Sequence, residues 1–106
     1  MDKLFVKGNK DGVLVRLGRG GVRRFGVFEW GFHKGGPLAL ALMRAAFSGR
    51  DDGEEWARVY APWFQQDVLA RLDKDAQEVE FTVDMDRWVY DRTAKGAIKI
   101  TKGATS

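Results

Sequence analysis

The sequence lacks cysteine, and its 106 residues include one histidine, His33, and two serines, Ser48 and Ser106. The lack of cysteine excludes a disulfide framework and a thiolate metal site. It also suits the reducing cytoplasm, where we expect the chain to act. Triad chemistry needs a nucleophile, a base and an orienting group together. With so few candidates for these roles, we predict a non-catalytic protein without a cofactor.

Long apolar runs are missing too. No stretch approaches the ~20 apolar residues of a membrane span, and residues 1–7 have no apolar run typical of a signal peptide. Instead, a hydrophobic content of 44% with seven Phe, four Trp and two Tyr is typical of a packed globule. We therefore predict one domain over residues 1–106, with a frayed tail at 102–106.

Acidic residues are scarce at the two ends of the chain, and basic residues are scarce in its middle. Residues 1–50 hold ten Lys and Arg against three Asp and Glu, and residues 51–91 hold four against twelve. Residues 92–106 hold four basic residues and no acidic ones. These blocks of +7, −8 and +4 can bind partners of opposite charge, or neutralise one another in the folded chain.

The first third of the sequence predicts a β-meander. Residues 3–7 and 13–17 are expected to be strands joined by a turn at Gly8 to Gly12, because Gly, Asn and Asp tolerate the backbone angles of hairpin loops. A second Gly-rich turn at 18–21 precedes a third expected strand at 22–30.

The rest of the chain predicts two main helices and one clear strand. Pro37 suits a helix start before the apolar residues 38–47. Aromatic and apolar residues recur every four positions over 54–72, where Pro62 predicts either a kink or a second helix start. Residues 79–85 alternate as in a half-buried strand.

Two segments near the C-terminus complete this outline. Residues 87–92 suit a strand or a helix equally, and residues 97–101 suit a last strand. Together the elements predict an α+β fold, with an antiparallel sheet of four to five strands packed on two main helices. Trp30, Trp56, Trp63 and Trp88 are expected in its core.

The segment Phe28-Glu29-Trp30-Gly31-Phe32-His33-Lys34-Gly35-Gly36-Pro37 and the Leu-Ala repeat after it resemble an uncharacterised family of short bacterial and phage proteins. The hallmark of that family is F-E-W-G-Y-G-G-x-G-P-x-x-L-A-L-A-L-L. His33 and Lys34 replace glycines, and two residues are missing after Pro37. The resemblance implies a fold and a mobile-element setting, but it implies no activity.

The strongest functional signal is a group of arginines around the Gly18–Gly21 turn. Arginine forks bind phosphates through two hydrogen bonds, and glycine lets backbone amides approach an anion. Phe25 could stack on a base. The alternative is that these arginines pair with the acidic strand carrying Glu78, Glu80 and Asp84. The candidate anion-binding residues are Lys10, Arg16, Arg19, Arg23, Arg24 and Lys34.

Lys34 joins this set because it lies where Gly35-Gly36-Pro37 opens a helix, whose amides can hold a phosphate. The Walker spacing is absent, and a plain turn explains the same residues. Acidic residues Asp84, Asp86 and Asp91 offer oxygen ligands suited to Mg²⁺. Carboxylates also collect at helix starts, where they complement the helix dipole, and we expect no metal site here.

Three functions remain open on this basis. The first is a non-catalytic binding protein of phage or mobile-element type that docks its basic N-terminal surface onto nucleic acid or a nucleic-acid-handling complex. The second is an inhibitor of a host enzyme or defence complex, in which the acidic segment 51–91 mimics nucleic acid through Glu78, Glu80 and Asp84. The third is a small enzyme that uses Glu29 and His33.

Overall fold

The computed structural model of the chain describes residues 3–31 and 33–94. Four strands and three α-helices follow the order β1, β2, β3, α1, α2, β4, α3, with a 3-10 helix, η1, after α2. Their bounds are β1 Lys3–Asn9, β2 Gly12–Leu17, β3 Arg23–Phe25, α1 Gly36–Ala46, α2 Gly53–Asp67, η1 Leu69–Arg71, β4 Glu78–Asp84 and α3 Met85–Ala94. The α+β fold expected from the sequence is confirmed.

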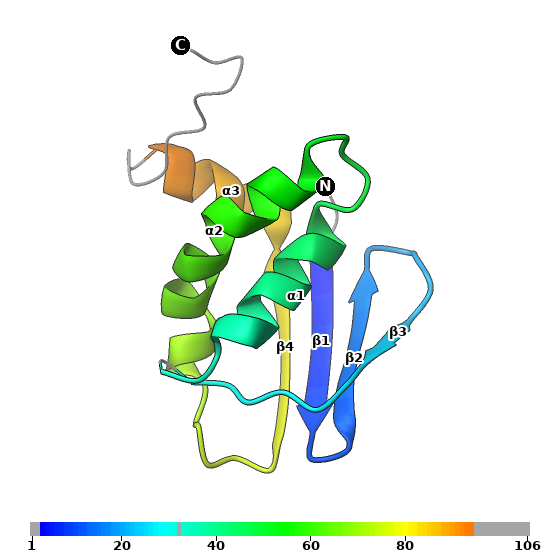
Figure 1. Ribbon diagram of the computed structural model, residues 1–106, viewed down its shortest axis with the longest axis vertical. Helices are drawn as coiled ribbons and strands as arrows, with labels where there is room; N and C mark the ends of the chain where they lie inside the picture. Colours follow the sequence, from blue (N-terminus) through cyan, green and yellow to red (C-terminus); the bar gives the residue numbers. More distant parts are fainter. Residues whose placement is uncertain (1–2, 32, 95–106) are drawn as a thin grey trace.

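The strands form one antiparallel sheet in the order β3-β2-β1-β4 (Figure 1). Consecutive strands β1 and β2 form a hairpin. Strand β4, which follows the first two helices in the sequence, pairs with the other side of β1. Directly paired residues of a sheet point to the same face. Val6, for example, pairs with Val15 on one side and Phe81 on the other, which makes one face of the sheet apolar.

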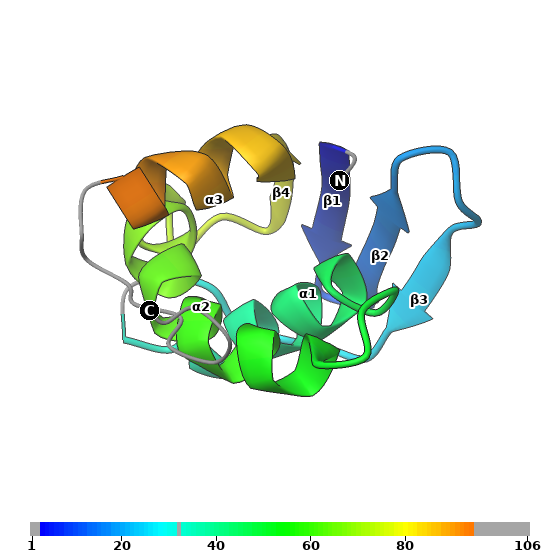
Figure 2. The ribbon, with the colours of Figure 1, turned by 90° about the horizontal axis from the view of Figure 1, so that it is seen from above.

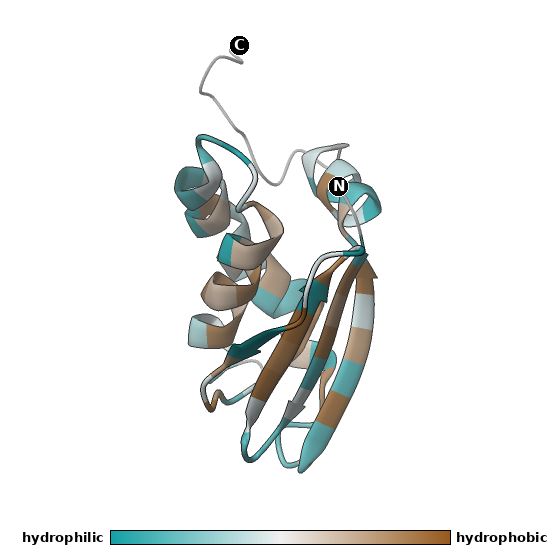
Figure 3. Ribbon diagram, turned by 90° about the vertical axis from the view of Figure 1, so that its right-hand side faces the viewer, coloured by the Kyte–Doolittle hydropathy of each residue, from teal (hydrophilic) through white to brown (hydrophobic). Residues whose placement is uncertain are grey.

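The helices cover only that apolar face. Figure 3 shows α1 and α2 on one side of the sheet and none of the described elements on the other, and Figure 2 shows α3 extending from the end of β4 toward α2. We call the uncovered side the open face. Its strand side chains are Lys3, Phe5, Lys7, Asn9, Leu14, Arg16, Arg24, Glu78, Glu80, Thr82 and Asp84.

Helix α1 is the central helix expected from its composition. Pro37 lies in its first turn, where a missing backbone N–H is tolerated. Leu38, Leu42 and Met43 are fully buried between the sheet and α2. Burial of each such side chain contributes about 1.5–3 kcal/mol.

Helix α2 contains Pro62 within one continuous helix, so the second helix start predicted there does not occur. Instead the helix ends at Asp67, and η1 follows after Val68. Pro62 lies on an exposed part of the helix, where water can satisfy the carbonyl that the proline leaves without a donor. The expected helix over 54–72 is therefore two elements.

An aromatic cluster joins α1, α2 and α3. Tyr60 is fully buried at its centre, with ring centroids 5.5 Å from Phe47 and from Trp56 and 5.6 Å from Trp88. Such pairs stabilise a core by about 0.5–1.5 kcal/mol beyond the area that they bury. All four tryptophans are buried or pack against the buried core, as expected.

Helix α3 settles the open question at residues 87–92 in favour of a helix. Asp84 ends β4 and accepts a hydrogen bond from the backbone N–H of Arg87 at 3.2 Å. This is the bond of an N-cap, in which a side-chain oxygen satisfies one of the first N–H groups of the helix. The strand alternation therefore stops at Asp84, and Met85 is the first residue of α3.

The third strand is much shorter than the expected 22–30, because the chain leaves the sheet after Phe25. Trp30 explains the departure: its indole is 7% exposed, and its N–H donates to the carbonyl oxygen of Asp73 at 3.0 Å. The ring lies over Gly8, where an added Cβ would approach its Cζ3 atom to 3.2 Å. Trp30 thus packs on the sheet from a loop rather than from a strand.

The expected strand at 97–101 and the expected tail at 102–106 lie outside the described residues. Within residues 3–31 and 33–94, no helix has the length and apolar character needed to cross a membrane.

Candidate anion-binding surface

The connection between β2 and β3 projects from the edge of the sheet (Figures 1 and 2). Gly18 has a φ of 58°, a left-handed conformation that glycine adopts without strain. Its N–H donates to the carbonyl oxygen of Lys3 at 2.8 Å, and the N–H of Gly20 donates to Leu17 at 3.0 Å. We call residues 16–24, with Arg16, Arg19, Arg23 and Arg24, the arginine arm.

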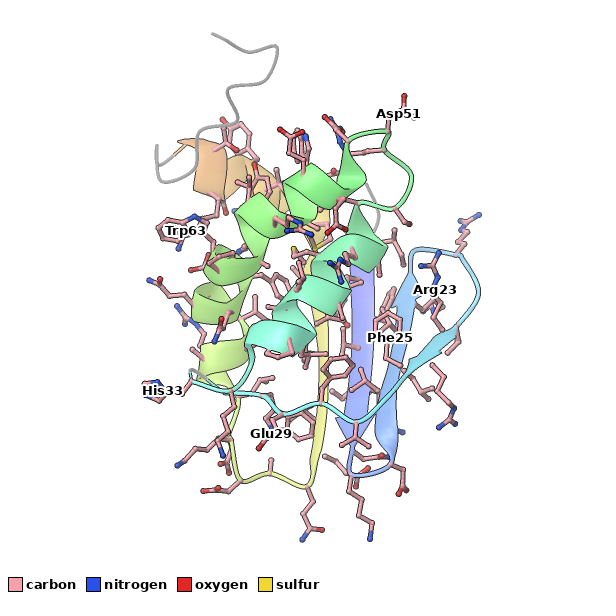
Figure 4. All side chains as sticks on the ribbon, in the orientation of Figure 1. Arg23, Phe25, Glu29, His33, Asp51 and Trp63 are labelled. Atoms are coloured by element: carbon pink, nitrogen blue, oxygen red, sulfur yellow. The ribbon has the colours of Figure 1, made fainter. Side chains whose placement is uncertain are left out.

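The two arginines of β3 point to opposite sides of the sheet. Arg23 pairs with Val15, whose side chain faces the helices, and Arg24 pairs with Leu14 on the open face. Both arginines are exposed. Figure 4 labels Arg23 at the outer edge of the sheet, beside the loop that carries the rest of the arm.

Arg16 is more constrained than the other arginines of the arm. Its guanidinium lies 4.1 Å from the ring centroid of Phe5 on the open face, and it donates to the carbonyl oxygen of Gly18. Arg19 is exposed at the tip of the turn. The arm therefore presents cationic groups at its tip and on both of its sides.

Ion pairing separates the arm from the other arginines. After residue 36, Arg44, Arg50, Arg58, Arg87 and Arg92 each form an ion pair with a carboxylate, and Arg71 forms none with the residues that the structure describes. By contrast, no arginine of the arm lies within ion-pair distance of a carboxylate of the described residues. The alternative prediction, that Glu78, Glu80 and Asp84 neutralise these arginines within the chain, is therefore wrong for this part of the structure.

The two predicted lysines lie away from the arm. Lys10 is in the β1–β2 turn, at the other end of β2 from the Gly18–Gly21 turn. Lys34 lies in the loop before α1, and its Nζ is 3.6 Å from Oε1 of Glu29. Of the six candidate residues, the fold brings together the four arginines only.

Phe25 is not presented for stacking on a base. It is half-buried and on the helix side of β3, opposite Val13. Its ring meets Phe28 edge-on, with centroids 6.4 Å apart. We therefore assign Phe25 to packing beneath the arm.

A hollow of about 180 Å³ lies between the arm and the C-terminal end of α1, lined in part by Gly20, Gly21, Arg23 and Ser48. The Ser48 hydroxyl donates to the carbonyl oxygen of Ala45 at 2.9 Å. Carbonyl groups at a helix C-terminus carry partial negative charge and disfavour anions. The electrostatics therefore favour anion contact on the outside of the arm rather than in this hollow.

The acidic residues of the segment 51–91 do not form one surface. Asp52, Glu54 and Asp67 form ion pairs with arginines. Glu54 accepts from Arg44 at 2.8 Å and from Arg58 at 2.8 Å, and these bonds lower its pKa to about 2. Three other acidic residues, Glu78, Glu80 and Asp84, are exposed along the open face of β4 and form no ion pair with the described residues.

Glu29 and His33 occupy separate points of the loop between β3 and α1 (Figure 4). Glu29 is engaged by Lys34, and both His33 and Glu29 are exposed. Asp84 caps α3, and Asp91 pairs with Arg87 at 3.7 Å. Across the residues that the structure describes, no group of three or more His, Cys, Asp or Glu is placed to hold a metal ion.

The open face is a second surface that the sequence pattern did not predict. A shallow hollow of about 170 Å³ lies on it, lined among others by Phe5, Leu14, Val22 and Thr82. Val22 is 64% exposed. The alternation of Phe5 and Leu14 with buried residues contained the signal, but only the strand order shows that no described helix covers them.

No family model, no curated protein and no solved structure matches the chain. The resemblance to short bacterial and phage proteins therefore stays a prediction.

Proposed function

We propose that the chain is a non-catalytic binding protein of phage or mobile-element type, whose arginine arm docks onto the phosphate backbone of nucleic acid or onto a nucleic-acid-handling complex. One observation carries the proposal. The arm keeps four guanidinium groups without carboxylate partners among the described residues, while five of the six later arginines are ion-paired. A cation without an internal partner is available to an external anion.

Docking works by charge neutralisation. Each phosphate that an arginine neutralises releases condensed counterions, so affinity falls as salt concentration rises. Arginine suits this role because its planar fork donates two parallel hydrogen bonds to a phosphate. The arm contains no aromatic residue and no helix that could read base edges, so we expect little sequence preference.

The test is a titration of a labelled duplex with the full chain at several salt concentrations. Four phosphate contacts predict that affinity falls by about two orders of magnitude between 50 and 200 mM salt. In the double variant R19Q/R23Q, we expect an affinity loss of about tenfold or more and a salt slope reduced by about 2. Flat affinity across this salt range contradicts the proposal.

A matched control is available in α1 and α2. The variant R44Q/R58Q removes the same charge, but from arginines that both pair with Glu54. We expect it to bind the duplex within about threefold of the wild type. Equal losses in the two double variants would mean that net charge, and not the arm, determines binding.

The exposed acidic residues of β4 favour a second candidate, an inhibitor that mimics nucleic acid. Glu78 and Glu80 both point from the open face and form no ion pair with the described residues. Affinity capture from a bacterial lysate, with and without nuclease, distinguishes the two functions. Partners lost on nuclease treatment support the arm, and a protein partner lost only in E78R/E80R supports the inhibitor.

A further inference from the structure

The open face carries charges of opposite sign on its two sides. Glu80 on β4 is level with Lys7 on β1, which is level with Leu14 on β2, which in turn is level with Arg24 on β3. One row across the sheet thus begins with a carboxylate and ends with a guanidinium. Three strand spacings separate the two, roughly 14 Å, so they do not pair within one chain.

The middle of the open face is apolar and cationic rather than acidic. Phe5 and Leu14 are half-buried there, and the guanidinium of Arg16 lies over the Phe5 ring. Val22 is 64% exposed at the border of the 170 Å³ hollow. A partner that fits this face needs apolar and aromatic groups at its centre that can receive Lys7 and Arg16, a cationic side to meet β4 and an anionic side to meet β3.

A second copy of the chain meets these requirements. We infer that two copies pack through their open faces about a two-fold axis that runs parallel to the strands between β1 and β2. This rotation places β4 of one copy opposite β3 of the other and keeps each row at its level. Glu80 then faces Arg24 of the second copy, and the symmetry makes this pair twice.

The same rotation fills the centre of the interface. Phe5 of one copy faces Arg16 of the other, so each guanidinium lies between two phenyl rings. Thr82 is level with Phe5 and Arg16, and continuing the β2–β3 register by one residue puts Val22 opposite Arg16, so Val22 faces Thr82 of the other copy across the axis. Sheets that pack face to face lie about 10 Å apart, a gap that the combined length of glutamate and arginine side chains spans.

Other two-fold packings of this face are disfavoured. An axis perpendicular to the strands places β4 over an antiparallel β4 and β3 over β3, which brings the acidic strand with Glu78, Glu80 and Asp84 against the same acidic strand of the other copy. Like charges so placed cost several kcal/mol. A nucleic acid is a poorer occupant than a second copy for the same reason, because its phosphates meet the acidic side of the face.

The face is small, which favours a weak dimer. The four strands hold 7, 6, 3 and 7 residues, so at a rise of about 3.3 Å and a strand spacing of about 4.8 Å they cover roughly 360 Å² of each sheet, or about 700 Å² over both copies. Interfaces of this size fall below the range of stable specific complexes and belong with weak, transient ones. We therefore expect a dimer with a dissociation constant on the order of 10–100 µM that weakens at high salt.

Charge reversal across the axis tests the inference. The experiment is sedimentation equilibrium of the full chain without nucleic acid, over about 5–500 µM protein. The wild type is expected to shift from monomer to dimer over this range. The variants E80R and R24E each place two like-charged pairs in the interface, and we expect each to weaken dimerisation at least tenfold.

The double variant E80R/R24E decides the geometry. It restores opposite charges only across the two-fold axis, so we expect a dissociation constant within about threefold of the wild type. The control R23E changes the same charge as R24E one residue away, but on the helix side of β3, and should leave the dimer intact. Glu80, Arg24 and Arg23 are all exposed, so each variant should keep the wild-type urea midpoint.

Three results would overturn the inference. A wild type that stays monomeric over the whole range leaves the face to another occupant. A dimer that neither single variant weakens uses another surface. A dimer that both single variants weaken and the double variant does not restore has a different arrangement. None of these readouts contains nucleic acid, so they stand apart from the test of the arginine arm.

Discussion

Asp67 at the end of α2 holds Arg92 of α3 through two hydrogen bonds. The Nε atom of Arg92 donates to Oδ2 at 2.5 Å, and one terminal nitrogen donates to Oδ1. The indole N–H of Trp88 also donates to Asp67, at 2.9 Å, and the guanidinium lies 4.5 Å from the centroid of the Trp63 ring. One carboxylate thus joins two helices that lie far apart in the sequence.

Asp67→Asn should destabilise the fold. The side chain of Arg92 is 12% exposed and that of Asp67 is 23% exposed, so the substitution leaves a largely buried cation without its counter-ion. Full burial would cost about 3–5 kcal/mol, and we expect about 2 kcal/mol after partial solvation. Urea unfolding followed by tryptophan fluorescence measures the loss.

A more exposed ion pair provides the comparison. Arg87 and Asp91 lie one turn apart on α3 with side chains 79% and 47% exposed, and Asp91→Asn should cost less than about 0.5 kcal/mol. Equal losses in the free energy of unfolding for Asp67→Asn and Asp91→Asn would show that the pair between α2 and α3 contributes no more to stability than an exposed pair.

Glu54 should make the fold sensitive to acid. Its bonds with Arg44 and then Arg58 lower its pKa from the ordinary 4.5 to about 2. A carboxyl whose pKa is lower in the folded chain binds protons more readily in the unfolded chain. Its contribution to stability is therefore present above pH 4.5 and is lost as the pH falls toward 2.

The substitution E54Q isolates this contribution. We expect E54Q to be less stable than the wild type at pH 7 and the difference to close between pH 4.5 and 2. Urea midpoints across this pH range measure it. The variant R44Q/R58Q removes the cause of the pKa shift and should lose the same part of the pH dependence. If the difference in urea midpoint between E54Q and the wild type stayed constant with pH, Glu54 would not be the source of the acid sensitivity.

Gly53 should not tolerate alanine. A Cβ at this position would lie 2.3 Å from the carbonyl oxygen of Phe47, which is backbone and cannot rotate away. We expect Gly53→Ala to cost about 2 kcal/mol or more. The nearby Gly49 has nothing within 4 Å of its Cβ position and no positive φ. Gly49→Ala should therefore stay within about 0.5 kcal/mol of the wild type, as thermal unfolding of both variants can show.

Arg16 and Arg24 belong to both proposals, which predicts competition between them. In the dimer Arg16 faces Phe5 and Arg24 faces Glu80 of the second copy, so a polyanion that engages either arginine binds the monomer more tightly. A short oligonucleotide should lower the dimer fraction in sedimentation velocity. Sodium chloride at the same concentration of negative charge should not. An unchanged dimer fraction at saturation would mean that the arm binds through Arg19 and Arg23 alone.

Much of the fold follows from local sequence signals. The Gly8 to Gly12 turn, Pro37 before α1 and the alternation over β4 each act within a few residues, so they predict their elements directly. The length of β3 does not follow, because Trp30 leaves the sheet to reach the carbonyl oxygen of Asp73, 43 residues away. Tertiary contacts of this kind override a local alternation.

The candidate site was predictable only in part. Clustering of arginines around a Gly-rich turn is visible in the sequence, and the fold keeps those four together. Whether Glu78 and Glu80 neutralise them depends on strand order, since β1 and β2 lie between β4 and β3. Whether Lys34 is available to an anion depends on the fold of its loop, which brings Glu29 within ion-pair distance. Neither relationship is encoded by spacing along the chain.

Both edge strands of the sheet, β3 and β4, are protected against pairing with a strand of another chain. β3 has three residues, two of them arginines, and β4 carries glutamate at alternate positions. Short and charged borders resist the addition of another strand, which is how many β-proteins avoid fibrous aggregation. The dimer proposed above uses the open face of each sheet, and its two-fold symmetry closes it at two chains. An association of this kind ends as a closed pair, whereas strand addition at an edge can continue as an open-ended polymer.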